Sequence, residues 1–208
     1  MIIKTLVLGP LQTNTYIVGC EDTNEAVIID PSGEADKIIR EISNLNLVVK
    51  YILNTHTHFD HIGGNAELVE YFKAKLLMHR DAVSMLKDSG GASAFGMDVP
   101  PSPEPDGFLE HNDKIKFGSH CFEVFYTPGH APGHVVFYEP NNKALFAGDV
   151  LFWGSIGRSD LDGGDHDLLV KCIKDYLLTL PEDTVVYSGH GPVTNIGQEK
   201  RNNPYLQD

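Results

Sequence analysis

Hydrophobic residues fall into short runs along this chain, and a few longer stretches carry them at helical spacing. Continuous β-branched runs at residues 26–29, 48–53 and 185–187 predict strands that are buried on both faces. Turn residues bound a second set of apolar segments. These segments are also expected to be strands, and they cover residues 2–8, 13–19, 75–78, 113–117, 121–126, 135–139 and 143–147.

Helices are expected between these strands. Apolar residues recur every three or four positions in residues 34–45 and again in 168–180, which predicts two amphipathic helices. Shorter helices are expected at residues 66–72 and 81–87. Residues 88–107 are rich in Gly, Ser and Pro and predict a flexible surface loop. Two interpretations of this loop stay open, a lid over a binding site or a plain connector.

The order of these elements is similar in the two halves of the chain. Each half has antiparallel strands, a strand that ends at an aspartate (Asp30 or Asp149), a helix, and a strand that ends before a histidine (His56 or His190). This order predicts an α+β fold, a four-layer αββα sandwich with two packed sheets inside and helices outside. The 208 residues suffice for a single domain, 1–208, with a substantial core. Asp30, followed by proline, is expected to cap the turn before its helix.

Composition narrows the classes of partner. The formal net charge of −13 opposes nucleic-acid binding, which depends on basic side chains that neutralise phosphates. No apolar stretch approaches the roughly 20 residues that span a membrane, and the N-terminus lacks the features of a signal peptide. Three scattered cysteines without a CxxC pair are typical of reduced thiols. We therefore expect a cytoplasmic protein that acts on a small molecule, and the sequence does not indicate its oligomeric state.

A histidine cluster follows the run at 48–53. His56, His58, Asp60 and His61 lie within six residues, just before a glycine pair. Imidazole and carboxylate are the groups that bind zinc and related divalent metals at neutral pH. His56 and His58 are two positions apart, so they point the same way on extended backbone. This pattern favours two metals side by side over one.

Three further candidate ligands each follow a predicted strand and have a glycine beside them: His130, Asp149 and His190. With the cluster they make seven donors, about the number that two metals sharing a hydroxide need. We predict that His56, His58 and His130 hold the first metal, that Asp60, His61 and His190 hold the second, and that Asp149 bridges both. Zinc is the expected metal, and iron or manganese would suit the same ligands.

These motifs resemble those of a known family. HxHxDH with GGN, then TPGH, GD and SGHGP, is similar to the motif set of the metallo-β-lactamase superfamily, and the similarity runs through essentially the whole chain. The glyoxalase II-like branch is the most similar. Residues 157–160 and the tail 189–205 resemble the small bacterial members of that branch.

The resemblance implies a hydroxyacylglutathione hydrolase-like thioesterase that acts on a substrate such as S-lactoylglutathione. A hydroxide that bridges two metals would attack the thioester carbonyl, and the metals would stabilise the oxyanion. Asp60 would both bind a metal and orient the hydroxide. The thiolate leaves with little acid assistance, because thiol pKa values are near ~8.5.

The family's full-length glyoxalase II enzymes carry a C-terminal helical domain that helps to hold glutathione. Here the chain stops 18 residues after His190, so we expect no such domain. Binding of a substrate carboxylate would then fall to Arg158 or to Lys200 and Arg201. The alternative for each of these cations is a solvated surface charge.

Other functions of the same fold remain as rivals. Persulfide dioxygenases resemble this chain up to Asp149 but use a single iron held by two histidines and an aspartate. His190 within SGHGP favours a complete second metal site and hence hydrolysis. The negative net charge argues against a nuclease. Asp149 as a bridging ligand and the missing secretion signal argue against β-lactam hydrolysis, and the seven donors argue against a non-enzymatic metal-binding module.

Overall fold

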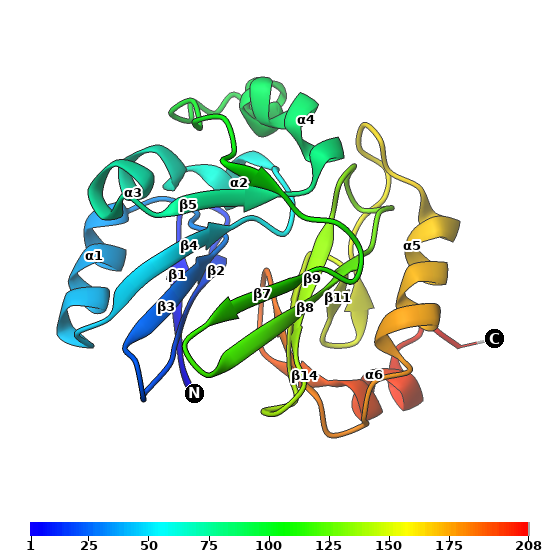
Figure 1. Ribbon diagram of the computed structural model, residues 1–208. Coiled ribbons are helices and arrows are strands. Elements are labelled where there is room, and N and C mark those ends of the chain that lie inside the picture. Colours follow the sequence, from blue (N-terminus) through cyan, green and yellow to red (C-terminus); the bar gives the residue numbers. More distant parts are fainter. Residues whose placement is uncertain (208) are drawn as a thin grey trace.

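Two six-stranded sheets pack face to face in the computed structural model, which describes residues 1–207, and helices cover both outer faces (Figure 1). Apolar cores lie between the sheets and between each sheet and its helices. The predicted αββα sandwich is therefore confirmed. Within residues 1–207, no helix combines the length and apolar character that crossing a membrane requires.

The first sheet contains the N-terminal strands. Its order is β1 (Ile2–Leu8), β2 (Thr13–Gly19), β3 (Glu25–Ile29), β4 (Val48–Leu53), β5 (Lys75–Met78) and β6 (Gly107–Phe108). The pairs β1–β2 and β2–β3 are antiparallel, whereas β3 to β6 run parallel. Helices α1 (Ala35–Asn44) and α3 (Asn65–Phe72) bury Ile38, Ile42 and Leu68 against this sheet (Figure 1).

The second sheet contains the C-terminal strands. Its order is β14 (Thr194–Asn195), β13 (Val185–Ser188), β10 (Ala144–Gly148), β9 (Val135–Glu139), β8 (His120–Tyr126) and β7 (Lys114–Phe117). Only β10 and β13 pair in parallel. Helix α5 (His166–Cys172) and α6 (Ile196–Asn202) pack on its outer face, and Leu169 and Ile196 lie in the core there.

Aromatic side chains fill the space between the sheets. Phe117, Phe122, Phe137 and Phe146 are fully buried there. Tyr16 from the first sheet contacts Phe146 edge to face, with ring centroids 5.3 Å apart. Aromatic burial of this kind dominates core energetics, so the sheets form a rigid support for the loops at their edge.

The two halves share the predicted arrangement. β3 leads to Asp30 and pairs in parallel with β4, while β10 leads to Asp149 and pairs in parallel with β13. Because parallel strands end at the same edge of a sheet, each aspartate lies near the histidine loop that follows the partner strand.

Several short elements differ from the sequence predictions. The helix expected at 81–87 is a 3₁₀ turn, Arg80–Ala82, followed by α4 (Val83–Lys87). The segment expected to be one helix over 168–180 is α5 followed by a π-helical turn, Ile173–Leu177. The 88–107 loop begins with a 3₁₀ segment, Ser89–Phe95. Strands β11 (Leu151–Phe152) and β12 (Ser155–Ile156), and helix α6, were not predicted; two-residue strands are too short to show alternation.

Candidate metal centre

All seven predicted donors meet at one edge of the sandwich. The loop after β4 and the short helix α2 (Phe59–Ile62) carry four of them, and the loops after β8, β10 and β13 carry one each. The set is His56, His58, Asp60, His61, His130, Asp149 and His190. Loops held by a rigid scaffold are where binding and catalytic sites are commonly built.

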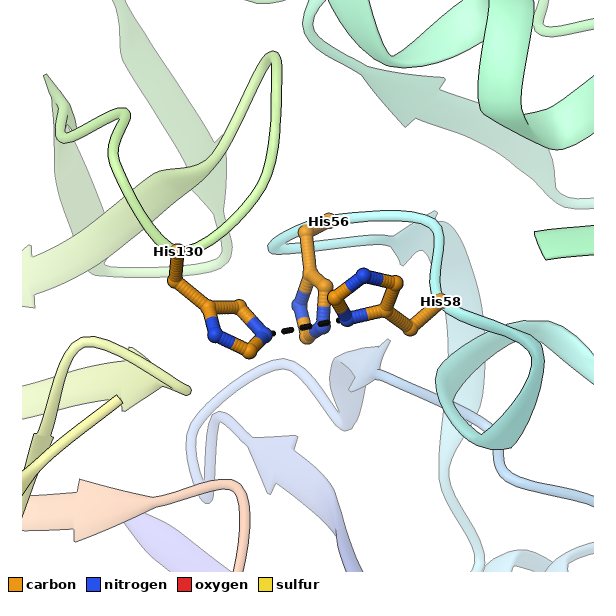
Figure 2. A group of neighbouring side chains, drawn as sticks. All are labelled: His56, His58 and His130. Atoms are coloured by element: carbon orange, nitrogen blue, oxygen red, sulfur yellow. Dashed lines mark hydrogen bonds between the residues drawn. The ribbon is translucent and has the colours of Figure 1, made fainter. Parts of the chain in front are cut away.

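His56, His58 and His130 form the first donor group. Figure 2 shows their rings turned toward one another, with His56 and His58 from one loop and His130 from the facing loop. One ligand atom from each lies within 4.8 Å of those from the other two. His130 Nε2 and His58 Nδ1 are only 3.0 Å apart. Three converging nitrogens are a geometry that suits a divalent metal.

Asp60, His61 and His190 form the second group, also within 4.8 Å of one another. Asp60 Oδ2 lies 3.4 Å from His61 Nε2 and 3.1 Å from His190 Nε2. Thr13 donates its hydroxyl hydrogen to the same oxygen at 2.9 Å, which fixes the carboxylate. This group is also of a kind that zinc, iron or manganese accepts.

Asp149 lies between the two groups. Its Oδ1 is 3.5 Å from His61 Nε2, while its Oδ2 is 3.6 Å from His130 Nε2 and 3.5 Å from His190 Nε2. One carboxylate oxygen therefore faces only the second group and the other faces both. This position is the one that a ligand shared by two metals would occupy.

Unpaired polar atoms show that the residues fit metal ions. His56 Nε2, His61 Nε2 and Asp149 Oδ1 are buried and have no hydrogen-bond partner within residues 1–207. Buried polar atoms almost always have a partner, and an orphaned one costs free energy. Cations bound at the two groups would satisfy these three atoms.

Hydrogen bonds to the other ring nitrogen orient three of the histidines. His130 Nδ1 lies 2.8 Å from the Arg158 carbonyl oxygen, and His190 Nδ1 lies 3.2 Å from that of Leu11. A carbonyl oxygen can only accept, so Nδ1 carries the hydrogen and Nε2 keeps its lone pair for a metal. His61 Nδ1 donates in the same way to Asp30 Oδ2 at 3.0 Å.

Asp30 has a different role from the predicted turn cap. It is buried, and its Oδ1 accepts from the Thr55 backbone N–H at 2.7 Å. Its Oδ2 accepts from the Thr55 hydroxyl at 2.6 Å and from His61. The Thr55 oxygen in turn lies 3.0 Å from His56 Nδ1. Asp30 thus orients one histidine of each group, which the prediction of a cap missed because its partners lie 25 and 31 residues away.

His134 and Thr13 are further residues around the donors. The His134 ring stacks on that of His56, and its Nε2 accepts from the Asp149 backbone N–H at 3.1 Å. Its closeness in sequence to His130 is the one signal that could have pointed to His134. Nothing near Thr13 in the sequence indicated its bond to Asp60.

Two glycines allow the backbone to approach the donors. A Cβ at Gly189 would lie 2.1 Å from Asp149 Oδ1 and 2.9 Å from His61 Cε1. At Gly148, φ is +48° and a Cβ would lie 2.4 Å from Thr55 Oγ1. Any side chain at either position would displace donors or their supports.

The electrostatic environments of the two groups differ. Burial and neighbouring histidines lower the pKa of His56 well below its usual value, and burial with nearby His130 lowers the pKa of His58 to about 4. Burial also opposes protonation of His61, but the carboxylates of Asp60, Asp149 and Asp30 raise its pKa to about 10. The first group is therefore neutral and ready to bind metal at pH 7, whereas His61 holds a proton.

We expect metal binding at the second group to release at least one proton per chain at pH 7.5, because the metal displaces the His61 proton and the nearby carboxylates raise the pKa of His190 as well. The His61 pKa is raised, so metal affinity of this group should rise with pH up to about 10. Neutral His56 and His58 should release none. Calorimetric titration in two buffers of different ionisation enthalpy measures the proton count. Affinity independent of pH between 6.5 and 8.5 would contradict this expectation.

A cavity of about 270 Å³ opens above the donors. Arg158 lines it, but Lys200 and Arg201 are not among its described lining residues. The Arg201 guanidinium pairs with Glu182 at 2.6 Å. Of the three cations predicted to bind substrate, the structure thus brings only Arg158 to the donors.

Comparison with known proteins identifies a family. The model of the metallo-β-lactamase superfamily matches residues 8–190, which include all seven donors. Hydroxyacylglutathione hydrolase GloC of Haemophilus influenzae is 38% identical over 99% of this chain and 98% of its own length.

Solved structures also resemble this chain. The crystal structure of the BLEG-1 B3 metallo-β-lactamase superposes with a TM-score of 0.94 at 42% identity and covers 100% of both chains. The structure of TTHA1623 in a di-iron-bound form gives a TM-score of 0.90 at 41% identity, over 98% of this chain and 100% of that chain.

Proposed function

The chain belongs to the metallo-β-lactamase superfamily, and from that premise we propose that it is a two-metal hydrolase of thioesters such as S-lactoylglutathione. The observation that carries the proposal is the position of Asp149 between the two donor groups. Among the described residues, its Oδ1 and the buried Nε2 atoms of His56 and His61 have no hydrogen-bond partner. A hydroxyacylglutathione hydrolase among the similar proteins supports the choice of substrate.

Divalent metals bound at the two groups would activate water at neutral pH and polarise the substrate carbonyl. Asp60, whose carboxylate accepts a hydrogen bond from Thr13, lines the cavity and would orient the attacking water. The water oxygen bonds to the carbonyl carbon and the C–S bond breaks, which yields a carboxylic acid and a thiol. The pKa of the leaving thiol is about 8.5, so no separate general acid is required.

Two metal sites also separate this proposal from a dioxygenase that uses one iron. Two histidines and Asp149 would suffice for a single iron, whereas Asp60, His61 and His190 form a further complete group. That group supports hydrolysis.

β-Lactam hydrolysis is a second candidate, favoured by the 42% identity to a protein described as a B3 metallo-β-lactamase. Both reactions add water to a carbonyl carbon, so the same site could serve either. A thioester differs from a β-lactam in its leaving group, which is a thiolate and needs little protonation.

The test is release of free thiol from S-lactoylglutathione by protein reconstituted separately with zinc, iron or manganese. Two comparison substrates are used: a β-lactam, and a persulfide with which oxygen consumption is followed at an electrode. We expect fast thiol release with at least one metal. No thiol release from S-lactoylglutathione or from a second lactoyl thioester, by protein that holds two metals, would overturn the proposal. Oxygen consumption with one bound iron would replace it by the dioxygenase.

A further inference from the structure

Apart from the donors, the cavity has an almost entirely apolar wall. Five apolar side chains line it: Leu11, Phe59, Phe95, Phe152 and Leu161. The single other lining residue described is Arg158. We call these five side chains the apolar wall.

Arg158 is already engaged by a neighbour. Its Nε donates to Asp160 Oδ1 and its Nη2 to Asp160 Oδ2, both at 2.8 Å. These hydrogen bonds lower the pKa of the Asp160 carboxyl to about 2. This pair occupies two of the five N–H donors of the guanidinium, so Asp160 competes with a substrate carboxylate for Arg158.

The mouth of the cavity exposes apolar surface. Leu11 is 50% exposed and Phe95 51% exposed. Phe95, from the 3₁₀ segment Ser89–Phe95, contacts Phe59 with ring centroids 5.4 Å apart. Exposed apolar side chains that surround a few convergent polar groups are typical of a ligand site. A ligand that covers them would gain apolar burial.

The cavity is large enough for only part of a thioester substrate. About 270 Å³ is just below the usual range for ligand pockets, so the cavity has room for the reacting carbonyl and its immediate neighbours. The rest of the thiol portion would then lie at the mouth, where Leu11 and Phe95 are exposed beside Arg158.

We propose that the apolar wall selects the substrate, and that the preferred thioester carries an uncharged, apolar thiol portion rather than an anionic one such as glutathione. This inference rests on the proposed thioesterase function. The net charge of −13 acts in the same direction, because it disfavours approach of an anionic substrate.

The experiment compares two lactoyl thioesters, one of glutathione and one of phenylmethanethiol, on metal-loaded protein. Binding of the matching thioethers, in which a methylene replaces the carbonyl, is measured by calorimetry as a readout independent of turnover. We expect the apolar thioester to have a kcat/KM about tenfold higher, as burial of half an aromatic side chain would give. The apolar thioether should likewise bind more tightly.

Three variants test which residues are responsible. Phe95→Ala should lower kcat/KM for the apolar thioester about tenfold. Phe108→Ala, which removes an exposed phenylalanine outside the cavity, is the matched control and should leave kcat/KM unchanged for both thioesters. Asp160→Ala should free Arg158 and raise kcat/KM for the glutathione thioester about threefold, an effect that salt weakens.

The experiment distinguishes failure of this inference from failure of the proposed function. Equal or better turnover and binding of the glutathione compounds, with no effect of Phe95→Ala, would overturn the inference and leave the thioesterase standing. Hydrolysis of neither thioester by protein that holds two metals would instead overturn the proposed function.

Discussion

Asp149→Ala should lower thiol release on the order of 10³-fold, more than the 10- to 100-fold that loss of an outer hydrogen-bond partner costs at a metal site. The loss is large because Asp149 can contribute to both metal sites: its oxygens lie 3.5–3.6 Å from histidine nitrogens of both donor groups. Bound metal should fall from two ions per chain to one or fewer. Elemental analysis and the thiol assay measure the two effects.

Asp183→Ala is the matched control, because Asp183 is exposed and pairs with Lys143 away from the donors. It should keep both metals and full activity. His56→Ala should behave like Asp149→Ala, since it removes a buried donor nitrogen. Full activity with two bound metals in either donor variant would disprove the site assignment.

Asp30→Asn should weaken metal binding by about 10- to 100-fold without removing a donor. An amide nitrogen cannot accept the hydrogens that Thr55 and His61 now give to Asp30 Oδ2. The same mismatch leaves buried donors unpaired, so the free energy of unfolding should fall by about 1–3 kcal/mol. Chelator competition and urea denaturation of the metal-free protein measure the two quantities.

Asp162→Asn, at an exposed position, provides the control and should alter neither quantity. Unchanged metal affinity in Asp30→Asn would show that the orientation of His56 and His61 does not depend on Asp30. A loss of stability alone would then identify Asp30 as a purely structural residue.

Local pattern sufficed for the framework and for the donors. The β-branched runs at 26–29 and 48–53 indicated buried strands, and His56 to His61 lie together in sequence, so short-range information was enough. The later donors were found because each follows a strand whose end lies at the same edge as the others.

Local sequence patterns did not predict the contacts between distant segments. Asp30 reaches Thr55 across 25 residues, and Thr13 reaches Asp60 across 47. Neither pairing has a periodic signature, because it depends on how β2, β3 and β4 lie side by side. The engagement of Arg158 by Asp160 was likewise invisible, since neighbouring charges in a sequence need not touch.

The most direct measurement of the central claim is thiol release from a lactoyl thioester as metal is added stepwise to metal-free protein. The proposed two-metal hydrolase predicts that activity rises and reaches its plateau at two equivalents per chain. A plateau at one equivalent, or no thiol release after two metals have bound, would contradict it.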